Sequence, residues 1–136
     1  MQRRLLLVDD DMAVLLTLKA ALELNHFDVE IAGSVADALI KLNSGSFEVV
    51  ITDVRMETGD AGWQVLRAAR AQSYHPATAI LTAYPPSDDS WRNEPVESFL
   101  IKPIATHQLV QQLETLLAKH AQRHSGQEPS GGPSSS

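Results

Sequence analysis

Residues 4–11 read Arg-Leu-Leu-Leu-Val-Asp-Asp-Asp, and this stretch decides the fold class. Its apolar part, Leu5–Val8, is a short continuous run, as expected of a strand that is buried on both faces of a sheet. Three aspartates end the run, and apolar residues at helical spacing follow between Val14 and Leu22. Asp11 is a suitable N-cap for that helix. The stretch therefore predicts a buried strand that leads directly into a helix.

The same pattern of strand followed by helix repeats along the chain. Apolar and β-branched runs predict further strands at residues 27–32, 47–52, 77–81 and 98–101. Helices are predicted from Ser34 to near Gly45, around residues 65–69 and around residues 109–117. Such alternation favours parallel pairing through right-handed crossovers. We therefore expect an α/β fold, a doubly wound five-stranded parallel sheet of flavodoxin-like type with strand order 2-1-3-4-5 and helices on both faces.

Two segments depart from this regular pattern. Pro85, Pro86 and Pro95 flank residues 87–94, and proline cannot occupy a helix interior, so we expect the fourth helix to be short or irregular. Residues 1–121 are expected to form one domain. Residues 122–136 contain mainly Gly, Ser and Pro toward their end, and they are expected to be a disordered tail or linker.

The composition narrows the class of function. The chain has 136 residues, 43% of them hydrophobic, and it has no cysteine, which excludes disulfides and thiolate metal sites. The net charge of −6, without a basic stripe, argues against direct nucleic-acid binding. No run approaches the roughly 20 apolar residues of a membrane span, and the first residues do not resemble a signal peptide. We expect a cytoplasmic protein without a membrane segment.

Polar residues gather where the predicted strands end. Asp9, Asp10, Asp53, Thr82 and Lys102 follow or close four of the five strands, and the carboxyl ends of parallel strands are where such sheets bind ligands. Clustered carboxylates suit Mg²⁺, which prefers oxygen ligands and keeps several waters. The ammonium and hydroxyl groups can contact phosphoryl oxygens. An aspartate is ionised at neutral pH and needs no general base, so the set predicts a site that accepts a phosphoryl group.

Each residue alone also has an ordinary structural interpretation. Asp53 could be a solvated loop residue, Thr82 a strand-end residue with a satisfied hydroxyl, and Lys102 a surface residue; only their combination at four strand ends favours function. His120 and His124 are four residues apart, and we expect them on a solvated helix face. Trp63 and Trp91 fit either a core or an interface, and the sequence does not distinguish the two.

Four segments in order resemble one known family. These are residues 5–11 (LLLVDDD), 49–56 (VVITDVRM), 80–83 (ILTA) and 99–103 (FLIKP). Together they resemble the receiver domains of bacterial two-component systems, and the resemblance covers about residues 3–121. It implies that Asp53 is the phosphoacceptor and that the cofactor is Mg²⁺ or Mn²⁺. It also implies that Asp10 is a direct metal ligand beside Asp53, that Asp9 binds mainly through water, and that Arg55 contributes its backbone carbonyl.

The resemblance assigns further roles around the phosphoryl group. Lys102, Thr82 and the backbone of Ala83 would hold that group, with Thr82 moving toward it. Phe99 occupies the position of an aromatic switch residue. The peptide between Lys102 and Pro103 matches the family's cis peptide, a form accessible mainly before proline.

The chain also departs from the family pattern. Glu57 replaces the usual proline, and the segment of residues 57–62 is one residue longer, so we expect the loop beside Asp53 to differ. Arg55 and Tyr84 are large residues at two variable positions, and they predict slow hydrolysis of the phosphorylated form. The proline-rich segment of residues 85–95 lies where relatives form their output and dimer surface.

The leading hypothesis is a phosphorelay receiver that catalyses its own phosphorylation and dephosphorylation and is not a turnover enzyme. Its expected partners are a sensor histidine kinase or phosphotransfer protein and a downstream protein or missing output domain, with a phosphorylation-dependent homodimer as one possible form. The alternative is a degenerate receiver that binds proteins without phosphate. A Mg²⁺-dependent phosphatase with an aspartyl intermediate fits less well, because position 55 is Arg where such enzymes carry an acid.

Overall fold

A computed structural model describes residues 3–54, 61–83, 96–102 and 104–126, with side chains to residue 122. Its five strands form one parallel sheet in the order β2-β1-β3-β4-β5, which confirms the predicted fold class and strand order. The strands are β1 (Arg3–Val8), β2 (Phe27–Ala32), β3 (Val49–Thr52), β4 (Ala77–Thr82) and β5 (Ser98–Ile101).

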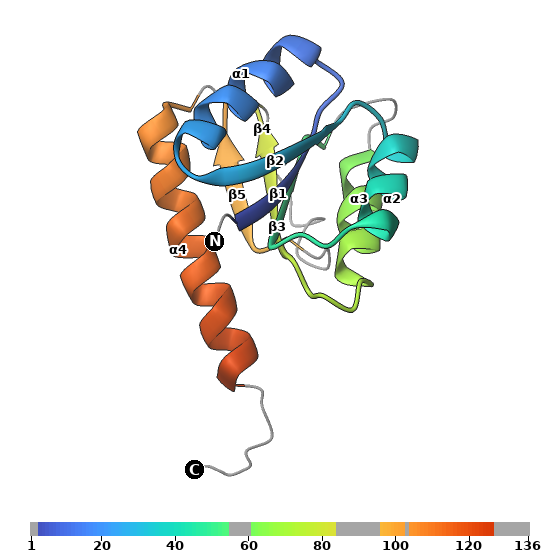
Figure 1. Cartoon of the computed structure of the whole chain (residues 1–136), viewed down its shortest axis with the longest axis vertical. Helices are drawn as coiled ribbons and strands as arrows, with labels where there is room; N and C mark the ends of the chain where they lie inside the picture. The colour runs from blue at the N-terminus through green and yellow to red at the C-terminus, as the bar shows by residue number, and fades with distance from the viewer. Residues whose placement is uncertain (1–2, 55–60, 84–95, 103, 127–136) are drawn as a thin grey trace.

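Helices cover both faces of this sheet, as the sequence predicted. Figure 1 shows α1 (Met12–Leu24) and α4 (Thr106–Gly126) on one face and α2 (Val35–Ser44) and α3 (Ala61–Arg70) on the other. The interior strand β1 is covered on both faces, which explains its continuous apolar run from Leu5 to Val8. Leu5 and Leu7 join the core under α1 and α4, whereas Leu6 and Val8 join the core under α2 and α3.

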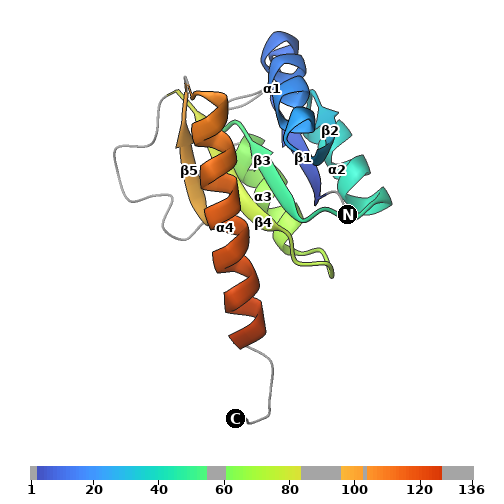
Figure 2. The ribbon, with the colours of Figure 1, turned by 60° about the vertical axis from the view of Figure 1, so that its left-hand side comes forward.

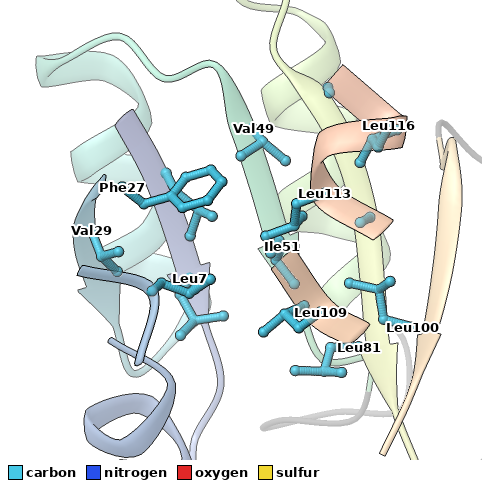
Figure 3. Packing of buried hydrophobic residues seen from close by; sticks show 14 of the residues in the cluster. Leu7, Phe27, Val29, Val49, Ile51, Leu81, Leu100, Leu109, Leu113 and Leu116 are labelled. Atoms are coloured by element: carbon cyan, nitrogen blue, oxygen red, sulfur yellow. The ribbon is translucent and has the colours of Figure 1, made fainter. Parts of the chain in front are cut away.

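The core under α1 and α4 is built mainly from aliphatic side chains. Figure 3 shows Leu109, Leu113 and Leu116 of α4 lying over side chains from β3, β4 and β5. Phe27 of β2 fills the same layer and is almost fully buried. The predicted leucine stripe of the last helix is therefore its packing face, with Leu117 only partly buried beside it.

Two predicted helix caps are confirmed. The Asp11 carboxylate accepts hydrogen bonds from the amides of Ala13 (3.0 Å) and Val14 (3.4 Å) at the start of α1. The Ser34 hydroxyl accepts one from the amide of Asp37 (3.1 Å) at the start of α2. Both caps satisfy amides that have no partner within the helix.

The structure differs from the sequence prediction at two ends. β3 begins at Val49 and not at residue 47, and Phe47 packs edge-on against Tyr74 with ring centroids 6.4 Å apart. α4 continues to Gly126, five residues past the expected domain boundary at 121, and Figure 2 shows its far end extending beyond the sheet. The predicted irregular fourth helix and residues 127–136 lie outside the described residues. No helix in the described part is both long and apolar enough to cross a membrane.

Candidate functional site

The backbone places the predicted site residues at the carboxyl end of the sheet. The Asp53 amide donates to the carbonyl of Val8 (2.9 Å), so the residue after β3 is fixed against β1. The Lys102 amide donates in the same way to the carbonyl of Thr82 (2.9 Å), which fixes the residue after β5 against β4. The sheet therefore holds both backbones with the last hydrogen bonds of its ladders.

Three charged side chains from three strand ends meet at this edge. The Lys102 ammonium lies 2.8 Å from Asp9 Oδ2 and 3.1 Å from Asp53 Oδ2. The side-chain exposures are 22% for Lys102, 4% for Asp9 and 14% for Asp53, so the group is largely shielded from water. A single ammonium group therefore forms ion pairs with two carboxylates.

The charge state of Lys102 follows from this environment. Burial lowers the pKa of its ammonium, but hydrogen bonds to Asp9 and Asp53 and the charges of these carboxylates outweigh that effect. The pKa of Lys102 therefore lies above its ordinary value of 10.5. Lys102 is a cation at neutral pH, as an anion-binding role requires.

The three consecutive aspartates have separate environments. Asp9 is buried, and its second carboxylate oxygen accepts a hydrogen bond from the amide of Asp11 (3.0 Å). Asp11 is exposed and caps α1. Asp10 is exposed at the same edge. A single acidic run in the sequence therefore supplies a buried ion-pair partner, an exposed carboxylate and a helix cap.

The remaining predicted residues lie around this group. Thr82 is 2% exposed at the end of β4, and Ala83 follows it at the surface. Phe99 lies on β5 and packs edge-on against Trp63 of α3, with ring centroids 6.4 Å apart and an interplanar angle of 74°. This contact assigns Trp63 to partly buried packing, a choice that the sequence left open. Ala83 and Lys102 also line a mainly apolar cavity of about 510 Å³ between α1 and the end of β4.

The oxygen ligands at this edge fit a hard divalent cation. Mg²⁺ is usually held by one or two carboxylates and several waters, so it does not need a dense cluster of side chains. Among the described residues, no group of three His, Cys, Asp or Glu side chains is close enough to enclose a metal ion. Asp10 and Asp53 nevertheless supply carboxylates at the same edge. Arg55, Glu57, Tyr84 and Pro103 lie outside the described residues, so the predictions made for them remain predictions.

One close contact at this site was not predicted. Gly62, in the first turn of α3, lies directly against the backbone of Asp53 and Val54, and its amide donates to the carbonyl of Val54 (3.0 Å). The sequence showed a glycine before a helix but not what lay beside it.

At the amino end of the sheet, the expectation for His120 is wrong. Its side chain is only 14% exposed, with Nδ1 2.9 Å from Glu97 Oε2 and Nε2 2.7 Å from the carbonyl oxygen of His75. The solvated face was inferred from helix spacing alone, but both partners come from distant parts of the chain. His120 therefore links α4 to the residues that precede β4 and β5.

Comparisons with known proteins agree with this architecture. The family model of the response regulator receiver domain matches residues 5–114. The chain is similar to the transcriptional regulatory protein PrrA of Mycobacterium tuberculosis, with 30% identity over 118 residues that cover 85% of this chain and 50% of PrrA. This chain spans about half the length of the curated relatives it matches.

Two solved structures have the same fold. A CheY-like response regulator receiver domain protein from Methanospirillum hungatei JF-1 gives a TM-score of 0.81 at 23% identity and covers 90% of this chain and 99% of its own. The receiver domain of the sensor histidine kinase PA1611 from Pseudomonas aeruginosa PAO1 gives 0.74 at 21% identity, with coverages of 87% and 99%. That domain has a magnesium ion coordinated in its active site cleft.

Proposed function

This chain belongs to the response regulator receiver domain family of two-component systems, and we propose that it receives a phosphoryl group on Asp53. The observation that carries the proposal is the contact of Lys102 with both Asp9 and Asp53 at the carboxyl end of the sheet. A cation beside an ionised carboxylate is what the transfer of an anionic group requires.

Asp53 would act as the nucleophile. A bond forms between phosphorus and an Asp53 carboxylate oxygen while the bond between phosphorus and the donor's imidazole nitrogen breaks, and the imidazole leaves. The carboxylate is 14% exposed, so it is accessible from the edge while its backbone is anchored to β1. The protein needs to supply few further covalent steps, because phosphoryl transfer depends mainly on positioning and charge neutralisation.

Lys102 and Thr82 would hold the group once it arrives. Lys102 already contacts Asp53 Oδ2, so its ammonium stands beside the atoms that the phosphoryl group joins. Thr82 and the backbone amide of Ala83 lie at the end of the neighbouring strand and would contact other phosphoryl oxygens. Phe99, which packs against Trp63, would respond to movement of Thr82.

A divalent cation is part of the proposal. Asp10, Asp53 and the backbone carbonyl of Arg55 would hold Mg²⁺ or Mn²⁺ directly, and Asp9 would do so through water. When bound, the ion would neutralise charge on the phosphoryl oxygens. The magnesium in the Pseudomonas aeruginosa receiver domain and the oxygen ligands at this edge support this assignment.

The partners follow from the family. The donor would be a phosphohistidine of a sensor kinase or phosphotransfer protein, and the recipient of the signal would be an output domain or a downstream protein. The protein would change its own phosphorylation state and would not turn over a separate substrate. The cytoplasmic location and the phosphorylation-dependent homodimer remain predictions.

The test is phosphorylation with a small donor. The chain is incubated with acetyl phosphate, with and without Mg²⁺, and its intact mass is measured beside that of Asp53→Asn. We expect one added phosphoryl group that requires Mg²⁺ and is absent from the variant. An unchanged wild-type mass, together with no spectral response to beryllofluoride, would contradict the proposal and favour a receiver that binds partners without phosphate.

A further inference from the structure

The first turn of α3 touches the backbone of the proposed phosphoacceptor. A Cβ built on Gly62 would lie 2.2 Å from the carbonyl oxygen of Asp53, 2.6 Å from Val54 Cα and 2.8 Å from the carbonyl carbon of Asp53. Contacts between carbon and oxygen in proteins are ordinarily about 3.3 Å or longer. Any residue other than glycine would therefore need a displacement of about 1 Å at this point.

The neighbouring contacts show where that displacement would go. The atoms facing Gly62 are backbone atoms, so no flexible side chain can move aside. α3 is held in place by the fully buried side chains of Val65 and Leu66 and by the contact of Trp63 with Phe99 on β5. On the facing side, Val54 is buried in the same core as Val65 and Leu66, and the Asp53 amide is bonded to the carbonyl of Val8. Because both sides are anchored, the helix and the Asp53–Val54 backbone would share the movement, and the Asp53 carboxylate would shift with its backbone.

We propose that Gly62 is a positioning residue for phosphoryl transfer. Its missing side chain lets α3 begin against the Asp53–Val54 peptide, and this contact fixes the Asp53 carboxylate relative to Lys102 and Asp9. The same hydrogen bond, from the Gly62 amide to the carbonyl of Val54, joins the helix to the segment that leads to Arg55. The inference rests on the proposed function, because it explains how Asp53 is aimed.

Another glycine of the chain supplies a matched control. A Cβ on Gly33 would meet no heavy atom within 4 Å, so Gly33→Ala adds the same methyl group without a clash. Both substitutions change the backbone freedom of one glycine to that of alanine. A difference between the two variants therefore reports the contact at Asp53.

The experiment compares initial rates of phosphorylation by acetyl phosphate over a range of Mg²⁺ concentrations. Rates are measured at a temperature where circular dichroism shows each variant fully folded. We expect Gly62→Ala to lose roughly 100-fold in the maximal rate at saturating Mg²⁺, as a 1 Å misplacement of a reacting group does, and Gly33→Ala to keep the wild-type rate. A merely structural role for Gly62 would lower the melting temperature and leave the maximal rate of the folded protein unchanged.

A measurement on the wild-type chain covers the case in which Gly62→Ala does not fold. In the amide NMR spectrum, adding Mg²⁺ and beryllofluoride should shift the Gly62 resonance more than that of Gly45, which lies at the other end of the sheet beside Arg4. An unmoved Gly62 resonance, or a folded Gly62→Ala that reacts within threefold of wild type, overturns the inference. If wild-type protein is not phosphorylated at all, the proposed function fails instead, and the inference falls with it.

Discussion

Charge is arranged differently at the two ends of the sheet. At the carboxyl end, the ammonium of Lys102 lies between the carboxylates of Asp9 and Asp53, and Asp10 is exposed beside them. The described side chains there leave an excess of negative charge. This excess is a cost in the absence of a cation, because like charges in a shielded site repel one another.

At the amino end, the charged groups form separate contacts between neighbouring elements and do not converge on one point. Both terminal nitrogens of the Arg3 guanidinium contact the Glu114 carboxylate (2.6 and 2.7 Å), and His120 lies against Glu97. Arg4 lies 3.3 Å from Glu30 and 3.4 Å from Asp28.

The comparison separates two uses of the same kinds of residue. The pairs at the amino end join β1 to β2 and to α4, and α4 to the residue before β5, and they stabilise the fold. The converging charges of Lys102, Asp9 and Asp53 at the carboxyl end are suited to a ligand that brings its own charge. Substitutions of the charges that converge at the carboxyl end should therefore change phosphorylation, whereas substitutions at the amino end should change stability alone.

The largest effect is expected for Lys102→Met. It removes the ammonium that contacts the buried Asp9 carboxylate and Asp53, so the free energy of unfolding at pH 7 should fall by about 3 kcal/mol. The rate of phosphorylation should fall at least about 100-fold. Chemical denaturation and intact-mass kinetics measure the two changes.

A pH series and a double variant check this explanation. Because the folded-state pKa of Lys102 is raised, its stabilising contribution is fully present below pH 10.5 and is lost as the pH rises through the higher folded-state value. Combining Asp9→Asn with Lys102→Met should recover stability but not phosphorylation. A single variant within about 0.5 kcal/mol of wild type would show that these charges are not coupled.

The second effect is expected for His120→Ala. Removing the imidazole leaves the Glu97 carboxylate, which is 12% exposed, without one of its partners, so the free energy of unfolding should fall by about 2 kcal/mol. Phosphorylation of the folded variant should match wild type within twofold. The exposed neighbour Lys119 provides the control, since Lys119→Ala should cost less than about 0.5 kcal/mol. A large loss of phosphorylation in His120→Ala would show that the amino end also affects phosphorylation, which would contradict this comparison.

The third prediction separates two adjacent aspartates at the carboxyl end. Asp11→Ala removes the cap of α1 and should lower the free energy of unfolding by about 1 kcal/mol without changing the phosphorylation rate. Asp10→Asn should leave stability within about 0.5 kcal/mol, because Asp10 is exposed, and should raise the Mg²⁺ concentration needed for half-maximal rate. The reverse pattern would mean that the roles of the two residues are exchanged.

The smallest effect is expected for Glu114→Gln. The hydrogen bond from Arg3 lowers the pKa of Glu114 from its ordinary value of 4.5, so the pair stabilises the fold above that pH and ceases to do so as the pH falls through the folded-state value. The pair is partly exposed, and its contribution at pH 7 should be less than about 1 kcal/mol. Melting curves of variant and wild type should differ at pH 7 and converge in acid or high salt; a constant difference at every pH would contradict this account.

The carboxyl end could be predicted because its residues are defined by where strands stop. The buried run of β1 ends at Asp9, and β5 ends one residue before Lys102, so strand order alone brings these residues together. The confirmed caps at Asp11 and Ser34 depend only on neighbours along the chain. Local pattern and sheet topology were sufficient for these features.

The amino end and the α3 contact could not be predicted in the same way. His120 meets Glu97 and the backbone of His75, which are 23 and 45 residues away, and helix spacing carries no information on such partners. Gly62 approaches Asp53 after a segment whose path the sequence does not define. These contacts depend on how elements pack, which residue spacing does not reveal.

The length of α4 has a mechanical consequence. Its 21 residues span about 31 Å, whereas the strands beneath it have four to six residues and span at most about 20 Å. The helix is thus a rigid rod whose first residue lies four residues after Lys102 and whose last turn lies beyond the sheet (Figure 2). By lever geometry, a tilt of about 5° at the root moves the tip by roughly 3 Å. A tilt too small to disturb the core near Thr106 therefore moves the Gly126 end of α4 by about the length of one side-chain contact.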